Sequence, residues 1–236
     1  MTSKINHQKY DNYGIVLETG TESIYPSNTK RLLGAQISND FSWNQHLILH
    51  EKSVRKVLNS KINALQKISW LADFKTRKML ANGLVQSNLV YVIQLYGSAC
   101  EYLIQSLQVQ QNRAARLVTK LEFGTSTKVL LTQVGWLSVH QLFVYHSLLL
   151  VYKVKQNGKP SFLNEKFSRD FKYRTRQAAS NDFVVMETPK SEIGRKSFIN
   201  TSRKLWNSLP AELKRASQLL IFKNGLRDWT LKNISI

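Results

Sequence analysis

The sequence predicts a mainly α-helical protein: a helical bundle with a short N-terminal β hairpin and a basic irregular linker before its C-terminal helices. From about residue 43 onward, apolar side chains recur with the period of an amphipathic helix. The chain has only 4 Pro and 10 Gly in 236 residues, which is too few for the many turns of a β-sandwich. Its hydrophobic content of 42% supplies enough apolar surface for a packed core.

β structure is expected only near the N-terminus. Residues 13–18 and 31–38 are short runs of β-forming residues, and the segment 19–29 between them is rich in turn formers. These runs predict a hairpin or two adjacent sheet strands.

The spacing of apolar residues defines the helices. Asp73 is expected to cap the second helix and Gly97 to close it. The most apolar segment, Leu142–Val154, is too short to span a bilayer and is interpreted as a buried helix. Residues 158–196 show little periodicity and are expected to form an extended basic linker with one strand at 183–187. Helices are predicted at about 44–69, 74–95, 99–120, 127–134, 138–156, 195–208 and 217–233.

The charge balance indicates a polyanionic partner. The chain has 34 Lys and Arg against 15 Asp and Glu, a net charge of +19. Residues 1–30 are neutral, while residues 31–99, 100–150 and 151–236 carry +6, +2 and +11. Such self-repulsion lowers stability unless an anion relieves it, so a phosphate backbone is the natural partner. A merely solubilising surface is the alternative. A membrane partner is not expected, because no exposed basic amphipathic helix or lipidation motif accompanies the charge.

Motifs for catalysis or metal binding are missing from the sequence. Polymerases and nucleases need convergent carboxylates for two divalent metal ions, yet no two acidic residues are adjacent and the six aspartates are far apart. His46 and His50 have the spacing of helical metal ligands, but no third ligand accompanies them, so a structural pair is preferred. The nucleophile elbow, the P-loop and the dinucleotide-binding fingerprint do not occur. We therefore expect no catalytic residue, no metal and no cofactor.

Cys100 is the single cysteine, which excludes an internal disulfide and a cysteine-based zinc site and fits an intracellular protein. It stands near an expected helix start, where a thiolate could be stabilised, but a small buried residue is the preferred interpretation. The first residues lack an apolar run, so no secretory signal is expected.

Basic residues are interleaved with aromatic ones in the segment 166–176, KFSRDFKYRTR, and again in 190–206. Guanidinium groups bind phosphate bidentately and aromatic rings stack on unpaired bases. The alternative for 166–176 is a solvated linker whose aromatic rings pack into the core, and in 190–206 Phe198, Leu205 and Trp206 are expected to be core residues. Further basic residues fall off the apolar stripes of the helices predicted at 44–69 and 99–120. The predicted nucleic-acid-binding residues are Lys52, Arg55, Lys56, Arg113, Arg116, Lys166, Arg169, Lys172, Arg174, Arg176, Arg195, Lys196, Arg203 and Lys204.

Five blocks of the sequence resemble, in family order, the C-terminal part of non-LTR (LINE-type) retrotransposon reverse transcriptases. Residues 30–47 are similar to the Lys-x-Leu-Gly segment that ends the palm and leads into the thumb, and residues 107–119 to a Leu-Gln-x-x-Gln-Asn-x-Ala-x-Arg helix. Residues 135–154 resemble a Trp-Leu-Ser/Pro-Val element with its long apolar helix. YRTR at 173–176 and LWNSLPAEL at 205–213 resemble later elements of the family.

The resemblance implies a remnant of the palm end with short strands at 1–42, a thumb-like helical bundle at 43–122, and a C-terminal helical region at 123–236 with the basic linker 158–196. It also implies a thumb beside a template-primer duplex and a C-terminal region that binds template RNA. The fingers, most of the palm and the Tyr-x-Asp-Asp turn would lie upstream of residue 1, and the endonuclease domain and cysteine-rich knuckle are also missing. On its own, the chain is therefore not expected to polymerise.

Three hypotheses follow. The first is a non-catalytic nucleic-acid-binding fragment of an RNA-directed DNA polymerase, whose partners are RNA or an RNA/DNA duplex and a full-length reverse transcriptase or the missing palm. The second is an inert structural relic of a truncated retroelement with no independent activity, suggested by the neutral residues 1–30 with their unpaired strands. The third is a ribonuclease or polymerase with an unfamiliar metal site.

Overall fold

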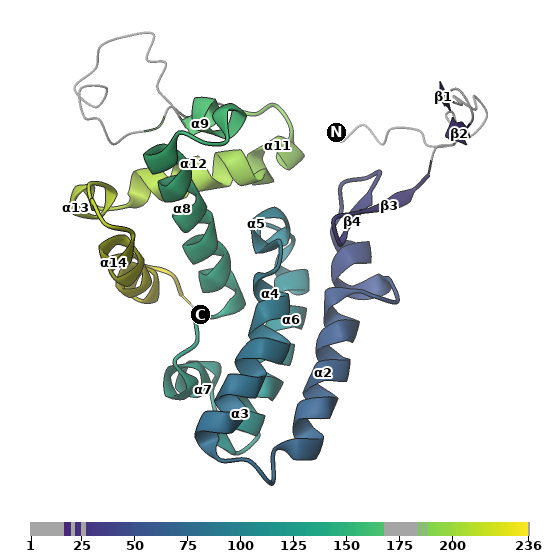
Figure 1. Cartoon of the computed structure of the whole chain (residues 1–236), viewed down its shortest axis with the longest axis vertical. Helices are drawn as coiled ribbons and strands as arrows, with labels where there is room; N and C mark the ends of the chain where they lie inside the picture. The colour runs from purple at the N-terminus through teal and green to yellow at the C-terminus, as the bar shows by residue number, and fades with distance from the viewer. Residues whose placement is uncertain are drawn as a thin grey trace.

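The computed structural model describes residues 27–167, 184, 186 and 188–235, together with the backbone of residues 17–19 and 22–24. It confirms the predicted fold class, because the described chain is mainly helical and its β structure is confined to short antiparallel pairs near the N-terminus. Figure 1 shows α2 (Val54–Ile68) beside the helical run α3–α5 within residues 74–96 and α6 (Glu101–Thr119), with α8 (Val139–Asn157) in the centre. The helices that follow α8 in the chain lie across its upper end and on its other side.

The N-terminal strands form two separate hairpins. β1 (Leu17–Thr19) pairs with β2 (Glu22–Ile24), and β3 (Thr29–Leu32) pairs with β4 (Ala35–Ser38). The prediction of one strand at 31–38 is wrong, because Leu33 and Gly34 both have positive φ angles (46° and 85°) and form the two-residue turn of a hairpin. This turn is held from outside: the Tyr91 hydroxyl donates to the Leu33 carbonyl. Of the run 13–18, only the backbone of 17–18 is described.

The predicted helix 44–69 is divided into a short π-helical segment, η1 (Gln45–Leu49), and α2 (Val54–Ile68). Ser53 explains the break, because its backbone is extended and its hydroxyl donates to the Ile48 carbonyl at 3.0 Å. Such a local side-chain bond offers the backbone an alternative to the helix.

The predicted helix 74–95 is interrupted as well. It consists of α3 (Phe74–Ala81), η2 (Asn82–Gln86), α4 (Ser87–Val90) and α5 (Ile93–Tyr96). Asp73 caps α3 as predicted, accepting from the Thr76 amide at 3.0 Å. The break comes at Val92, whose φ of 49° is incompatible with a continuous right-handed helix.

The next three predicted helices are confirmed within two residues at each end: α6 (Glu101–Thr119), α7 (Thr127–Val134) and α8 (Val139–Asn157). A capping box between Ser138 and Gln141 starts α8. As predicted, α8 is buried: it packs on α4, α5 and α6, and also on α9, α12 and α14. Among the described residues no single helix is long and apolar enough to cross a membrane, and α7 and α8 reach that length and hydropathy only as a pair bent by 50°.

The C-terminal region contains more helix than predicted. α9 (Ser161–Phe167) and α11 (Glu192–Lys196) lie inside the segment 158–196 that was expected to be irregular, and α13 (Ala211–Lys214) was not expected. α12 (Phe198–Ser208) ends before Pro210 as predicted, and α14 is Leu219–Asn233. Of the strand expected at 183–187, the described residues Val184 and Met186 are in no strand.

A single cluster of buried apolar side chains extends from Leu47 in η1 to Leu226 in α14. It crosses the boundary expected near residue 122, so the two helical regions share one core. Aromatic rings fill its C-terminal part, where Tyr152 stacks on Phe222 with ring centroids 4.0 Å apart and Trp206 lies 6.3 Å from Phe222. Trp206 is buried as predicted, whereas Phe198 and Leu205 are partly buried against the same cluster.

Gly97 closes α5 as predicted, but close packing is the reason for a glycine there. A Cβ at this position would lie 2.2 Å from Cδ2 of Phe143 in α8. We predict that Gly97→Ala lowers the unfolding free energy by about 1–3 kcal/mol, because α5 or Phe143 would have to shift. Gly83→Ala is the control, since nothing lies within 4 Å of its added Cβ. It should be neutral or stabilising by up to about 1 kcal/mol in urea denaturation. Equal effects of the two substitutions would contradict the packing argument.

Candidate nucleic-acid interface

α2 and α6 lie side by side and run in the same direction, as hydrogen bonds at three levels along them show. Near the start of α6, the Tyr102 hydroxyl donates to the side chain of Asn44, which precedes η1 and α2 in the chain. Midway, Arg113 Nη1 donates to Asn59 Oδ1 at 2.6 Å. Beyond the end of α2, the buried Arg77 donates to the carbonyls of Ala72 and Val118, the latter in the last turn of α6. The two helices therefore present adjacent solvent-facing edges.

Basic side chains gather on these edges. On and before α2, Lys52, Arg55, Lys56 and Lys67 are exposed. Lys56 and Lys67 lie opposite the buried stripe of Leu58, Ile62 and Leu65, whereas Arg55, three residues before Leu58, lies beside that stripe in the first turn. On α6, Arg113 and Arg116 are half-buried, and Lys120, which follows the helix, is exposed. We call this set the cationic strip: Lys52, Arg55, Lys56, Lys67, Arg113, Arg116 and Lys120.

Little negative charge opposes the strip. Between residues 51 and 122 the sequence has eleven basic and four acidic side chains, a net charge of +7, and α2 itself contains no Asp or Glu. Within the described part of the chain, none of the basic side chains of α2 forms an ion pair. The positive potential is therefore left to an external anion.

The two arginines that α6 contributes to the strip also have structural partners. Arg113 bridges Asn59 in α2 and Gln110 in α6 through Nη1, at 2.6 and 2.9 Å. The guanidinium carbon of Arg116 lies 5.0 Å from the ring centroid of Phe123. A guanidinium has five N–H donors, so Arg113 keeps donors for a phosphate after making these bonds.

The other predicted binding residues are dispersed. Lys166, Arg195 and Lys204 are exposed on α9, α11 and α12, and Lys196 pairs with Glu192 at 2.7 Å. Arg203 is 4% exposed, and its Nε and Nη2 donate to the Lys166 carbonyl at 3.0 and 2.7 Å, which satisfies the C-terminal end of α9. This burial makes Arg203 unsuited to phosphate contact. The remaining predicted residues, Arg169, Lys172, Arg174 and Arg176, lie outside the described residues.

Two residues of the strip, Lys67 and Lys120, were missing from the predicted binding set. Lys120 follows Arg116 by four residues, and Lys67 falls off the apolar stripe of α2, so helical spacing alone could have identified both.

Amide side chains of the 107–119 block attach α6 to the start of α8. Gln111 donates to the Leu137 carbonyl at 2.9 Å, and Gln108 accepts from the Val139 amide at 2.9 Å. The neighbouring 135–154 block is held from another side, because the Trp136 indole donates to Asn82 at 2.8 Å. In the last block, Asn207 both accepts from and donates to the backbone of Val184. The polar residues of these blocks thus hold the fold together.

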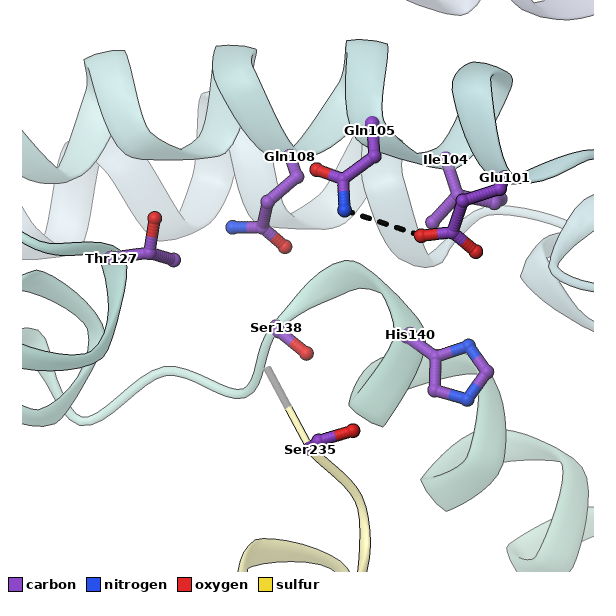
Figure 2. A pocket seen from close by; sticks show the side chains of 8 residues that line it. All are labelled: Glu101, Ile104, Gln105, Gln108, Thr127, Ser138, His140 and Ser235. Carbon is purple, nitrogen blue, oxygen red and sulfur yellow. Dashed lines mark hydrogen bonds between the residues drawn. The ribbon is translucent and has the colours of Figure 1, made fainter.

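A polar pocket of about 360 Å³ lies beside this junction. Figure 2 shows Gln105 donating to Glu101 on one wall, at 3.2 Å, and Ser138 and His140 on the opposite wall. Ser138 is occupied in capping α8.

Elsewhere, Cys100, which was predicted to be buried, is exposed. Among the described residues, no three His, Cys, Asp or Glu side chains lie close enough together to hold a metal ion.

Comparison with protein-family models, curated proteins and solved structures found no match for this chain. The functional assignment therefore rests on its own residues and their arrangement.

His46 is a buried residue whose protonation opposes folding. Its Nδ1 accepts from the Gln36 amide at 3.3 Å, its Nε2 has no partner, and its ring contacts Trp43 and Tyr96. Burial, assisted by the charge of Arg31, holds its pKa below the usual 6.5. Burial and the charge of Lys153 lower the pKa of His146 in the same way.

Because the unfolded chain binds these protons more readily, the stability is fully present above about pH 6.5 and is lost as the pH falls below that value. We predict a decrease of up to about 1.4 kcal/mol per pH unit for each histidine. His46→Asn keeps an acceptor near the Nδ1 position. It should reduce the change of the unfolding free energy with pH, measured by urea denaturation between about pH 8 and about pH 5. His146→Asn should flatten the remainder. A pH dependence unchanged by both substitutions would contradict the assignment.

Arg203 and Lys204 are adjacent in sequence but differ in burial, which permits a matched test. We predict that Arg203→Met lowers the unfolding free energy by about 2–3 kcal/mol, since it removes charged hydrogen bonds and leaves the Lys166 carbonyl unpaired. Lys204→Met should change it by less than about 0.5 kcal/mol. Chemical denaturation followed by circular dichroism measures both, and similar losses would refute the structural role of Arg203.

Proposed function

We propose that this chain is a non-catalytic nucleic-acid-binding fragment of an RNA-directed DNA polymerase of the non-LTR retrotransposon type, and that it holds RNA or an RNA/DNA duplex through phosphates. The observation that carries the proposal is the cationic strip: seven basic side chains on two adjacent parallel helices and the residues that flank them, with no carboxylate on α2. The ancestry is supported by the five sequence blocks in family order.

The dimensions of the strip suit a duplex. α2 has 15 residues and is therefore about 22 Å long. A duplex carries about one phosphate per 1.7 Å of its axis over both strands, so a duplex of this length has about a dozen phosphates, of which those on the near side can be contacted. Lysine and arginine on flexible stems contact such a backbone without reading bases, so we expect weak sequence preference.

The proposal is non-catalytic because the sequence places no two acidic residues together as the paired metal-binding aspartates of a polymerase require. We further propose that a partner protein covers the exposed apolar side chains near the β3–β4 hairpin, such as Leu33 (85% exposed) and Phe41 (65% exposed). In a full-length reverse transcriptase this end would adjoin the palm. An inert relic would have the same ancestry but would leave the strip unused.

Salt dependence distinguishes the proposal from the inert relic. If about six phosphates are contacted, log Kd for an RNA/DNA duplex should change with log salt concentration with a slope near 5, at about 0.9 per contact. Arg55→Gln with Lys56→Gln should weaken binding and reduce this slope by about two. The matched control removes two charges from α14, on the far side of α8 and α6 in Figure 1, as Lys223→Gln with Lys232→Gln.

The α14 variant should retain most of the salt slope, because its two lost charges lie away from the strip and do not contact phosphate in the proposed complex. Fluorescence anisotropy at several salt concentrations measures all three proteins. Absent binding, or equal effects of the two double variants, would refute the strip as the binding surface.

A further inference from the structure

Aromatic and apolar side chains are exposed at the end of the strip where α2 leads into α3. Trp70 and Leu71 are each 71% exposed, and Phe123, in the loop after α6, is 86% exposed. We call Trp70, Leu71, Phe74 and Phe123 the tip. Large apolar side chains gathered on one surface indicate contact with a partner.

The two loops that carry the tip are attached to each other. Arg77 is 8% exposed and donates from Nε to the Val118 carbonyl at 3.0 Å and from Nη1 to the Ala72 carbonyl. Phe123 is only five residues beyond Val118, which limits their separation to about 17 Å. Figure 1 shows α2 and α3 meeting at this lower end of the molecule.

Cations outnumber carboxylates around the tip, where Asp73 and Glu122 are the exposed acidic neighbours within the two loops. Lys67 and Lys75 flank the α2–α3 loop and are exposed, and Lys120 is exposed three residues before Phe123. Arg116 lies against the Phe123 ring, at 5.0 Å from its centroid, and so joins the tip to the cationic strip. Exposed rings beside basic side chains are the combination that binds unpaired nucleotides, because bases stack on the rings while cations hold the backbone.

We propose that the tip binds unpaired nucleotides adjoining the duplex, with Trp70 and Phe123 stacking on bases and Lys67, Lys75 and Lys120 contacting phosphates. The inference rests on the proposed function and extends it, since it assigns the duplex to the strip and single-stranded template to its end.

The hydrogen bond of the Trp70 indole favours unpaired nucleotides over a membrane as the ligand of the tip. Its indole N–H already donates to the Lys67 carbonyl at 2.9 Å. Tryptophan at a membrane interface uses that polar edge toward the wet side, whereas stacking needs only the ring face. The bond to Lys67 fixes the ring while leaving most of it exposed, which lowers the entropy cost of stacking.

The experiment compares a blunt RNA/DNA duplex with the same duplex carrying a single-stranded RNA overhang. Trp70→Leu keeps an apolar side chain but removes the ring. We expect it to weaken binding of the overhang duplex about 5- to 100-fold and to leave blunt-duplex binding unchanged. Trp70→Phe should lose less. Leu220→Ala, at a residue 67% exposed on α14, is the control for an unrelated apolar side chain and should have no effect.

Intrinsic fluorescence gives a second measurement. Of the other four tryptophans, Trp136 and Trp206 are 8% and 1% exposed and Trp43 and Trp229 are half-buried, so most of the quenching by stacked bases should come from Trp70 and be lost in Trp70→Leu.

The outcomes separate the two proposals. If Trp70→Leu binds both duplexes as the unchanged protein does, or weakens both equally, the inference fails. If Arg55→Gln with Lys56→Gln still weakens blunt-duplex binding, the proposed function survives that failure. Trp70-dependent sedimentation with phosphatidylserine vesicles, without an overhang effect, would overturn the inference in favour of a membrane site, and Trp70-dependent self-association would overturn it in favour of a second copy. Absence of wild-type binding to either duplex would overturn both proposals.

Discussion

The arrangement of the molecule depends on the burial of α8 between two sets of helices. Eleven of its 19 residues are buried, and they face α4, α5 and α6 as well as α9, α12 and α14. A helix buried on most sides cannot rotate without disturbing both sets. Gly97 allows α5 to approach it, and Gln108 and Gln111 attach its first turn to α6. The orientation of α6 is fixed in this way, and with it the edge that carries Arg113 and Arg116 beside α2.

The sequence was sufficient to place the helices whose apolar spacing, capping residues and chain breaks agree with their surroundings in the fold. α6, α7 and α8 could be placed closely because their apolar spacing, caps and breaks coincide. The breaks at residues 50–53 and at Val92 could not be predicted, because the apolar pattern continues across them. Their causes are the Ser53 hydroxyl bond to Ile48 and the left-handed backbone at Val92, neither of which changes hydrophobic spacing. The 31–38 hairpin shows the same limit, since a Leu-Gly turn is a weak signal inside a β-forming run.

The candidate site was only partly predictable, since sequence does not distinguish a basic residue that faces solvent from one that ties helices together. Arg77 and Arg203 are both buried, and each donates to carbonyls of other elements, as a planar guanidinium with several donors can. Lysine has a compact, strongly hydrated ammonium group and stays mostly at the surface, as Lys52, Lys56 and Lys67 do. An amphipathic stripe identifies the exposed set on α2, whereas the burial of Arg203 depends on the position of α9.

The basic side chains of the strip lie on the outer edges of the helices, apart from the apolar core. The charge needed to bind nucleic acid therefore does not disturb the packing that stabilises the fold. The cationic strip gathers seven basic side chains, and like charges at a surface repel one another over distances up to the Debye length of about 8 Å at physiological salt. This repulsion destabilises the folded chain, but it acts on the outer face of α2, away from the core cluster that runs from Leu47 to Leu226. A phosphate backbone would relieve the repulsion without moving a buried residue. Because a ligand that binds only the folded state stabilises it by about 2.7 kcal/mol at one hundred times its Kd, the charge that weakens the free protein is the charge through which nucleic acid would stabilise the complex.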